Sequence, residues 1–256
     1  MSEKIWHLAR CNLFEQLPPE IVADLERQAR RRRFPRKALI YLPADESDAV
    51  LLLAEGRVKL CHLAPDGKES ILAFVEPGEV FGELAIVDPG ERDEYAAALE
   101  PSTVILIPRD AIQPVIEQHP SVALEVTRLL GLRRRRIERR LRHLMFRSNR
   151  ERLAHLLLEL AERYGEQDAG GVRLSIRLSH QELAGLIGST RESVTVALGE
   201  LQAQGLVHVA RRLIVLKDVD RLAASVDAVA PPLPGRNSAM EKPTAASRYA
   251  QGSVQR

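Results

Sequence analysis

The spacing of hydrophobic positions changes along this chain and divides it into helical and β-rich segments. Apolar residues recur at helical spacing from Leu17 to Arg30, a segment that begins with two prolines, which a first helical turn tolerates. From about Arg31 to Pro108 they form short runs instead, separated by turn residues such as Pro65-Asp66-Gly67 and Pro77-Gly78. Many short strands with closely spaced turns predict an antiparallel barrel or roll.

After Pro108 the helical spacing returns. A short helix is predicted from Arg109 to His119, and a long one from Ser121 to Phe146. Apolar residues in the long helix are spaced by seven, four and three positions, as in the a/d seam of a coiled coil: Leu130, Ile137, Leu141 and Leu144. A second copy of the same helix is the natural partner of such a seam, so we expect a homodimer.

The last part of the chain has the pattern of a winged domain followed by a tail. The predicted elements are a helix over Asn149–Tyr164, a loop over Gly165–Gly171, a strand over Arg173–Leu178, a two-stranded wing (Val207–Ala210 and Leu213–Leu216) and a helix over Val219–Val226. From Ala228 onward, scattered Pro, Ser, Ala and Gln predict disorder.

Between the predicted strand and the wing, the segment from Ser179 to Ala203 has the pattern of a helix-turn-helix. Two capping boxes, Ser179 with Glu182 and Ser189 with Glu192, predict helices over His180–Ile187 and Thr190–Ala203. Ala184 is small where the helices cross, and Gly188 supplies the tight turn.

The second helix carries polar side chains on its first turn, as a helix that reads base edges in the major groove requires. Arg can donate to guanine O6 and N7, and Glu can accept from cytosine N4. The candidate DNA-binding residues are Ser179, His180, Gln181, Ser189, Thr190, Arg191, Glu192, Ser193, Thr195, Val196, Arg211 and Arg212. The alternative is a helical hairpin of an ordinary globular domain, in which Arg191 and Glu192 form a solvated charge pair.

Composition narrows the class of protein. The chain has 256 residues, a formal net charge of +2, 4 % aromatic residues and two cysteines. Few aromatics argue against single-stranded nucleic-acid binding by base stacking, and two cysteines are too few for a disulfide scaffold or a four-thiolate cluster. No signal-peptide or membrane-spanning run is evident, so we expect a soluble cytoplasmic protein without membrane partners.

Catalytic motifs are not found in the sequence. There is no P-loop, no Gly-x-Ser-x-Gly and no metal-binding histidine pair, so we expect no enzyme, no catalytic residue, no metal site and no cofactor. Eight arginines lie between Arg133 and Arg147, at the end of the long helix and directly after it, against one acid, Glu138. Such a helix also suits a sequence-blind DNA binder, which would bind specific and random DNA equally.

The ordered motifs of the chain resemble those of the Crp/Fnr family of bacterial transcription regulators. They are LFEQLPPE (13–20), AEGRVKL (54–60), PDGKESIL (65–72), PGEVFGELAIVD (77–88), LMF (144–146) and the helix-turn-helix. The resemblance implies an α+β fold with a cyclic-nucleotide-binding-like β-roll over 1–120, a dimerisation helix over 121–147 and a winged helix-turn-helix over 148–226. It does not reach the remaining segment, 227–256, which composition predicts to be a disordered tail. It also places Arg191 and Glu192 at base-reading positions, with Val196 where many members have a second Arg.

The resemblance also identifies an effector pocket in the roll. In members that bind cyclic AMP, a Gly-Glu-Leu segment supplies a glutamate for the ribose hydroxyl, and an Arg followed by Ser or Thr holds the phosphate. This sequence keeps that segment as Gly82, Glu83 and Leu84, and it keeps the arginine as Arg92.

The rest of the pocket departs from the family pattern. Asp93 and Glu94 follow the arginine; two carboxylates would repel a phosphate, and an ionised Asp donates no hydrogen bond. On the long helix, Ile137 and Glu138 replace the Thr and Ser that contact the base in cyclic-AMP binders. We therefore expect a degenerate pocket and a regulator that does not depend on cyclic AMP.

Arginines of the long helix are candidates to fill this pocket. Arg133, Arg134 and Arg136 could pair with Asp93, Glu94 or Glu100, so that protein carboxylates take the place of a ligand phosphate. In the alternative, these arginines form a solvated face that contacts DNA phosphate or the neighbouring subunit.

A sensor of the same architecture that needs another nucleotide, a redox change or a haem-bound gas is the other interpretation. Cys11 with His7 and Cys61 with His62 are conceivable ligands, but neighbours on a strand point to opposite faces and do not easily share a metal. The expected partners are double-stranded DNA with a two-fold symmetric site, a second copy of the chain and, for an activator, RNA polymerase. A dimer implies half-sites about one helical turn apart, ~10 bp.

Overall fold

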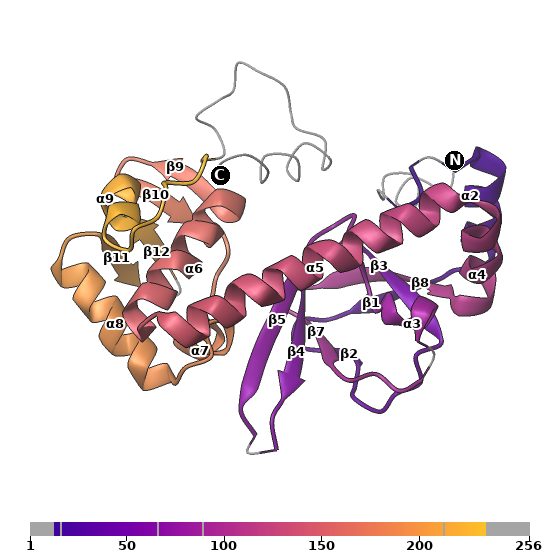
Figure 1. Ribbon diagram of the computed structural model, residues 1–256, viewed down its shortest axis with the longest axis horizontal. Coiled ribbons are helices and arrows are strands. Elements are labelled where there is room, and N and C mark those ends of the chain that lie inside the picture. Colours follow the sequence, from indigo (N-terminus) through magenta and orange to yellow (C-terminus); the bar gives the residue numbers. More distant parts are fainter. Residues whose placement is uncertain (1–12, 16, 66, 89, 212, 234–256) are drawn as a thin grey trace. The chain divides into compact units, whose positions relative to one another are not determined.

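In a computed structural model the chain forms two compact units, residues 1–136 and 137–256, which are described separately (Figure 1). The structure describes residues 13–15, 17–65, 67–88, 90–211 and 213–233. Within these residues no helix is long and apolar enough to cross a membrane.

The first unit is a β-roll covered by helices. Its strands are β1 (Arg30–Phe34), β2 (Leu39–Tyr41), β3 (Ala49–Glu55), β4 (Val58–Leu63), β5 (Glu69–Val75), β6 (Val80–Phe81), β7 (Tyr95–Ala98) and β8 (Ser102–Pro108). They form two antiparallel four-stranded sheets with the orders β1-β8-β3-β6 and β2-β7-β4-β5. Its helices are α2 (Pro19–Gln28), α3 (Leu84–Val87), α4 (Arg109–Gln118) and the first part of α5 (Pro120–Phe146).

Strand β3 shows why the roll sequence contains continuous apolar runs. Its alternate residues belong to two different cores: Leu52 packs in the cluster shared with the helices, whereas Leu51 and Leu53 pack in the cluster inside the roll. A strand that is buried on both faces has no polar positions to alternate with. The edge strand β1 is the opposite case, because four consecutive arginines (30–33) leave a charged edge that disfavours pairing with another chain.

The second unit is a winged helix. It contains the end of α5, then α6 (Asn149–Tyr164), β9 (Gly165–Asp168), β10 (Gly171–Leu174), α7 (His180–Ile187), α8 (Arg191–Ala203), β11 (Val207–Ala210), β12 (Leu213–Leu216) and α9 (Val219–Ala224). The four strands form one antiparallel sheet, β11-β12-β10-β9. Leu153, Leu183, Val194 and Leu201 are completely buried in this unit.

Three local predictions for this unit were wrong. The segment expected to be a loop contains strand β9, because residues 165–168 pair in register with Gly171–Leu174. The strand expected over Arg173–Leu178 therefore starts earlier and ends at Leu174. The second capping box is also wrong: Thr190, not Ser189, is the N-cap of α8, and its side chain accepts the backbone N–H of Ser193. Most of the predicted tail lies outside the described residues.

Gly56 occupies a turn that only glycine fits. Its φ is +86°, and a Cβ there would lie 2.4 Å from the carbonyl oxygen of Pro101. Gly67 has a similar φ of +81°, but a Cβ there would meet nothing within 4 Å. The two positions separate the effect of backbone strain from that of collision.

We expect Gly56→Ala to lower the free energy of unfolding by at least about 2 kcal/mol, since collision with backbone adds to the left-handed strain. Gly67→Ala is the matched control and should cost about 1 kcal/mol from strain alone. Urea denaturation followed by circular dichroism measures both. Equal losses for the two variants would contradict the close approach at Gly56.

Candidate nucleic-acid interface and effector site

The first helix of the helix-turn-helix, α7, starts at a complete capping box. The Glu182 backbone N–H donates to Ser179 Oγ at 3.2 Å, and the Ser179 N–H donates to the Glu182 carboxylate at 2.6 Å, as predicted. The helix ends at Gly188, whose φ of +62° is the left-handed conformation that glycine adopts readily. The turn predicted from Gly188 is thereby confirmed.

The start of α8 presents the side chains expected to read DNA. Arg191 and Glu192 are exposed, and Val196, one turn later, has 63 % of its surface exposed. Hydrogen bonds from the backbone N–H of Glu192 itself and from the Thr190 side chain hold the pKa of the Glu192 carboxyl below its usual value. The carboxylate is therefore ionised at neutral pH and can only accept, as pairing with cytosine N4 requires.

The hydroxyl group of Thr195 forms two hydrogen bonds within the protein. Its hydroxyl donates to the carbonyl of Arg191 at 2.9 Å and lies 2.8 Å from His180 Nδ1. Since the single hydroxyl proton is used, Nδ1 must carry the proton and donate to Thr195. These hydrogen bonds link the start of α7 to the exposed turn of α8. They do not involve Nε2 of His180.

The other candidate DNA-binding residues lie around the same turn. Gln181 and Thr190 are exposed, and Ser179, Ser189 and Ser193 are half-buried. In the wing, Arg211 is exposed in the turn between β11 and β12, whereas Arg212 lies outside the described residues.

The predicted effector residues converge in the first unit, with pairings that differ from those expected. Glu83, whose side chain is only 3 % exposed, forms an ion pair with Arg133 of α5. Arg133 also donates to the carbonyl of Val80 at 2.8 Å. The ion pair of Arg133 is thus with Glu83 and not with Asp93, which is exposed, whereas the expected proximity to Glu94 is present: the charge of Arg133 opposes the rise in the pKa of the Glu94 carboxyl that burial causes.

Arg92 is buried beside the same loop. Its Nη2 donates to the carbonyl of Ala49 at 2.7 Å, and its guanidinium lies over the Tyr41 ring, 4.2 Å from the centroid. Gly82 has a φ of +64°, and a Cβ there would lie 2.6 Å from Arg92 Nη1, so both the backbone conformation and the packing favour glycine. Among the described residues, no carboxylate forms an ion pair with Arg92.

The acidic residue Glu94 is linked to Arg92 through Tyr41, whose ring lies against the guanidinium. It accepts a hydrogen bond from the Tyr41 hydroxyl at 2.8 Å, and burial raises the pKa of its carboxyl. Burial and Glu94 together raise the pKa of Tyr41, which stays a neutral donor. Three other predicted pocket residues, Leu84, Arg134 and Ile137, are exposed.

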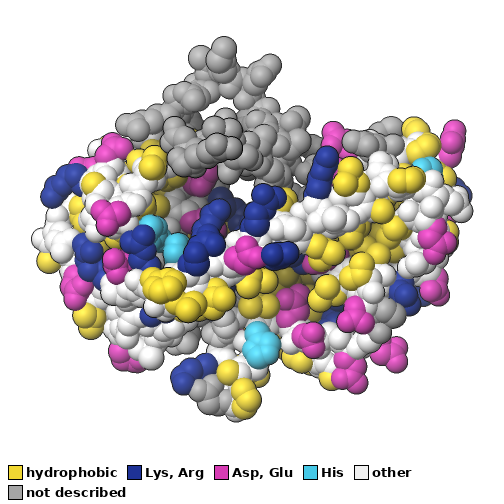
Figure 2. All heavy atoms as spheres, viewed as in Figure 1, with side chains coloured by type: hydrophobic (Ala, Val, Ile, Leu, Met, Phe, Trp, Pro, Cys, Tyr) yellow, Lys and Arg dark blue, Asp and Glu magenta, His cyan; other side chains and the backbone are white. Residues whose placement is uncertain are grey.

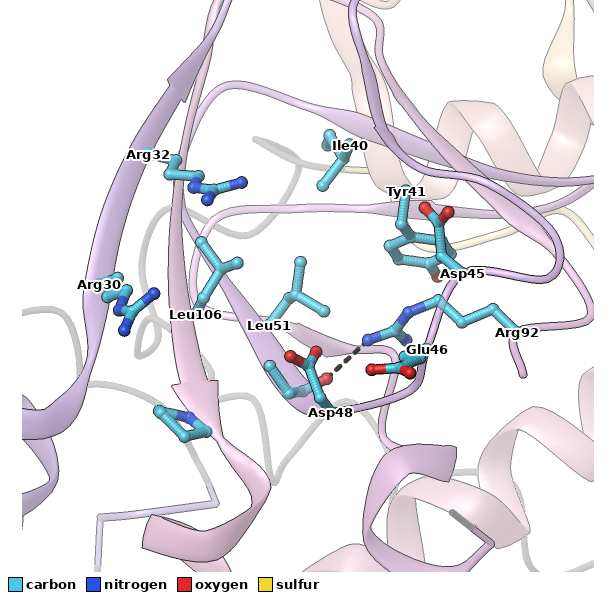
Figure 3. Close-up of a pocket in the computed structure, with 12 residues that line it drawn as sticks. Arg30, Arg32, Ile40, Tyr41, Asp45, Glu46, Asp48, Leu51, Arg92 and Leu106 are labelled. Atoms are coloured by element: carbon cyan, nitrogen blue, oxygen red, sulfur yellow. Dashed lines mark hydrogen bonds between the residues drawn. The ribbon is translucent and has the colours of Figure 1, made fainter. Parts of the chain in front are cut away.

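A cavity of about 340 Å³ has Arg92 and Tyr41 in its lining (Figure 3). Arg30 and Arg32 line one wall, and Asp45, Glu46 and Asp48 line the wall nearer Arg92. Gly82 and Glu83 do not line it. Arg92 therefore also lines a cavity that is separate from Gly82 and Glu83, which the sequence did not indicate.

The second half of α5 exposes the predicted seam. Ile137, Leu141 and Leu144 are 64 %, 55 % and 42 % exposed, and Phe146 is also exposed. Leu130, by contrast, is partly buried against the core of the first unit. Figure 2 shows dark blue Lys and Arg side chains gathered along this helix.

Cys61 has the environment of an unreactive thiol. It is fully buried on β4, and burial raises its pKa to about 12. Its neighbour His62 is exposed, as alternation along the strand predicts. In the part of the chain that the structure describes, no cluster of three or more His, Cys, Asp or Glu could hold a metal ion. Cys11 and His7 lie outside that part.

Each of the two units matches a known protein family. A family model for the cyclic nucleotide-binding domain matches residues 31–119, and one for the Crp-like helix-turn-helix domain matches residues 151–225. A CRP-like cAMP-activated global transcriptional regulator of Mycobacterium tuberculosis is 33 % identical over 216 residues, 84 % of this chain and 96 % of that protein. A cyclic AMP receptor protein of Thermus thermophilus is 34 % identical over 196 residues, 77 % of this chain and 88 % of that protein.

A solved structure agrees with these matches. A transcriptional regulator of the CRP family from Thermus thermophilus has a TM-score of 0.66 at 32 % identity, covering 78 % of this chain and 98 % of that chain. The fold class predicted from sequence, a cyclic-nucleotide-binding-like roll followed by a winged helix-turn-helix, is confirmed. The chain belongs to the Crp/Fnr family and is a DNA-binding transcription regulator.

Two histidines that the sequence did not single out meet where α5 is followed by α6. The rings of His143 and His155 stack with their centroids 4.7 Å apart. Burial lowers both pKa values, and the nearby Arg147 lowers them further, while Glu159 and Glu151 oppose the effect. No sequence pattern marked them, because they are twelve residues apart on different helices.

We expect the stability of the protein to fall as the pH drops below about 6.5, the ordinary pKa of histidine, because the unfolded chain then binds protons that the folded pair resists. The double variant His143→Gln/His155→Gln should flatten this decline while following the wild type near pH 8. Urea midpoints between pH 8 and 5.5 measure the effect. An unchanged slope in the double variant would assign the decline to other groups.

Proposed function

We propose that this chain is a homodimeric, sequence-specific regulator that reads DNA with the first turn of α8. The observation that carries the proposal is the start of α8: Arg191 and an ionised Glu192 in its first turn and Val196 one turn later are exposed together on a helix whose other face is buried. Arg191 would donate to a guanine and Glu192 would accept from a cytosine. Val196 would contact a thymine methyl where many family members have an arginine.

Dimerisation is proposed from the exposed apolar face of α5. Ile137, Leu141 and Leu144 repeat at a/d spacing and stay 64 %, 55 % and 42 % exposed, although Leu144 also lies close to Gly188. A second copy of α5 would bury them. The two α8 helices would then contact half-sites about one helical turn apart, ~10 bp, in a two-fold symmetric operator.

Independence from cyclic AMP is proposed from the contacts of the effector residues. Glu83 is paired with Arg133, and Arg92 is bonded to Ala49 and covered by Tyr41, so the groups that would hold ribose and phosphate already have protein partners. Glu94 adds a carboxylate near the site that would hold a phosphate. The protein would therefore be competent to bind DNA without an added ligand.

A second candidate is a regulator that requires a small effector. The cavity beside Arg92 favours it, because it offers a small ligand both the guanidinium of Arg92 and the carboxylates of Asp45, Glu46 and Asp48. Two relatives are named for cyclic AMP. If the protein activates transcription, RNA polymerase is its further partner.

We expect Arg191→Ala to relax the base preference at one position of each half-site and to reduce operator affinity by about 1–3 kcal/mol. Arg221→Ala, which removes the same charge from α9, is the matched control and should leave base preference intact. Affinities for an operator and its single-base variants measure the effect. A loss that is uniform over all sequences would show that Arg191 contacts only phosphate.

We also expect the operator affinity of the purified protein to change by less than about twofold when 1 mM cyclic AMP is added, because a ligand that does not bind cannot shift the affinity. Electrophoretic mobility shift with and without the nucleotide measures this. Strict dependence of DNA binding on cyclic AMP would overturn effector independence and support the second candidate.

A further inference from the structure

The carboxyl end of α7 lies against two other helices and needs partners for its carbonyl groups. The last four carbonyls of any α-helix have no acceptor role within the helix, and in α7 they belong to residues 184–187. The turn satisfies the first of them: the carbonyl of Ala184 accepts the backbone N–H of Gly188 and, at 3.0 Å, that of Ser189.

Two guanidinium groups satisfy the other three. Arg140 of α5 directs Nη2 to the carbonyl of Leu186 and, at 3.1 Å, to that of Gly185. Arg152 of α6 donates from Nη1 to the carbonyl of Ile187 at 3.0 Å. A cation is favoured at this end of a helix because the helix dipole is negative there.

Packing reinforces the contact between α5 and the turn. A Cβ added at Gly188 would lie 2.9 Å from Cδ2 of Leu144, so the turn is in close contact with α5 at this point. Arg140 and Leu144 are four residues apart, which places them on the same face of α5. The same face therefore holds α7 by hydrogen bonds and by apolar contact.

We infer that Arg140 is a positioning residue that fixes the helix-turn-helix to the dimerisation helix. The inference rests on the proposed function, in which two copies of α5 pair and each α8 contacts one half-site. Under that arrangement Arg140 helps to set the distance and angle between the two α8 helices. The protein would then select operators by the spacing of their half-sites as well as by their bases.

Loss of the Arg140 contact should loosen this selection without unfolding the domain. The capping box at Ser179, the αL turn at Gly188 and the buried core of α7 and α8 do not involve Arg140. A looser attachment lets each helix-turn-helix adjust to a displaced half-site. Affinity for the natural spacing should fall, because the free dimer must then be ordered on binding.

The test compares Arg140→Gln with Arg139→Gln, which removes the same charge from an exposed neighbour on the same helix. Each protein is titrated with a selected operator and with versions lengthened by one and two base pairs between half-sites. We expect the wild type and Arg139→Gln to lose about tenfold or more per insertion, and Arg140→Gln to lose less than about threefold. Arg140→Gln should also bind the natural spacing more weakly than Arg139→Gln.

Arg140→Lys keeps the charge, but its ammonium is on a flexible stem and lacks the planar geometry that aims Nη2 at both carbonyls, so we expect intermediate spacing selection. It also serves if thermal denaturation shows that Arg140→Gln does not fold. Spacing selection in Arg140→Lys and Arg140→Gln equal to that of Arg139→Gln would overturn the inference. A wild type that binds no operator, or that ignores half-site spacing, would instead contradict the proposed function.

Discussion

The arrangement of the helices in the second unit depends on hydrogen bonds to the carbonyl groups at the carboxyl end of α7. A carbonyl without a donor would weaken the attachment of this turn to the neighbouring helices, and each of the four carbonyls has a donor. Gly188 is required because the chain reverses in the left-handed region next to Leu144. With this turn fixed, the first turn of α8 can remain exposed, and its side chains are available to contact DNA.

Two buried charged groups in the roll also interact with other groups of the protein. Glu83 is almost fully buried, and a carboxylate without a partner would destabilise the fold there. The ion pair with Arg133 offsets that cost. Arg92 instead uses a carbonyl and the face of Tyr41. Arg133 and Arg140 lie seven residues apart on α5, so one helix supplies partners both to the roll and to α7.

Periodicity and caps predicted much of this structure because they are local. The alternation of apolar runs and turns indicated the roll, and Ser179 with Glu182 located the start of α7. The second cap was misplaced by one residue, because Ser189 and Thr190 can both cap and packing decides between them. The partner of Arg133 and the contacts of Arg140 could not be predicted, since a run of arginines does not show which member reaches a buried acceptor.

The central claim is that a dimer of this chain reads DNA with α8 without an added effector. Selection of bound DNA from a random duplex pool by the purified, ligand-free protein tests it most directly. The account predicts enrichment of a two-fold symmetric sequence with half-sites about one helical turn apart, ~10 bp. A pool that shows no enriched sequence, or an enriched single half-site without symmetry, would contradict it.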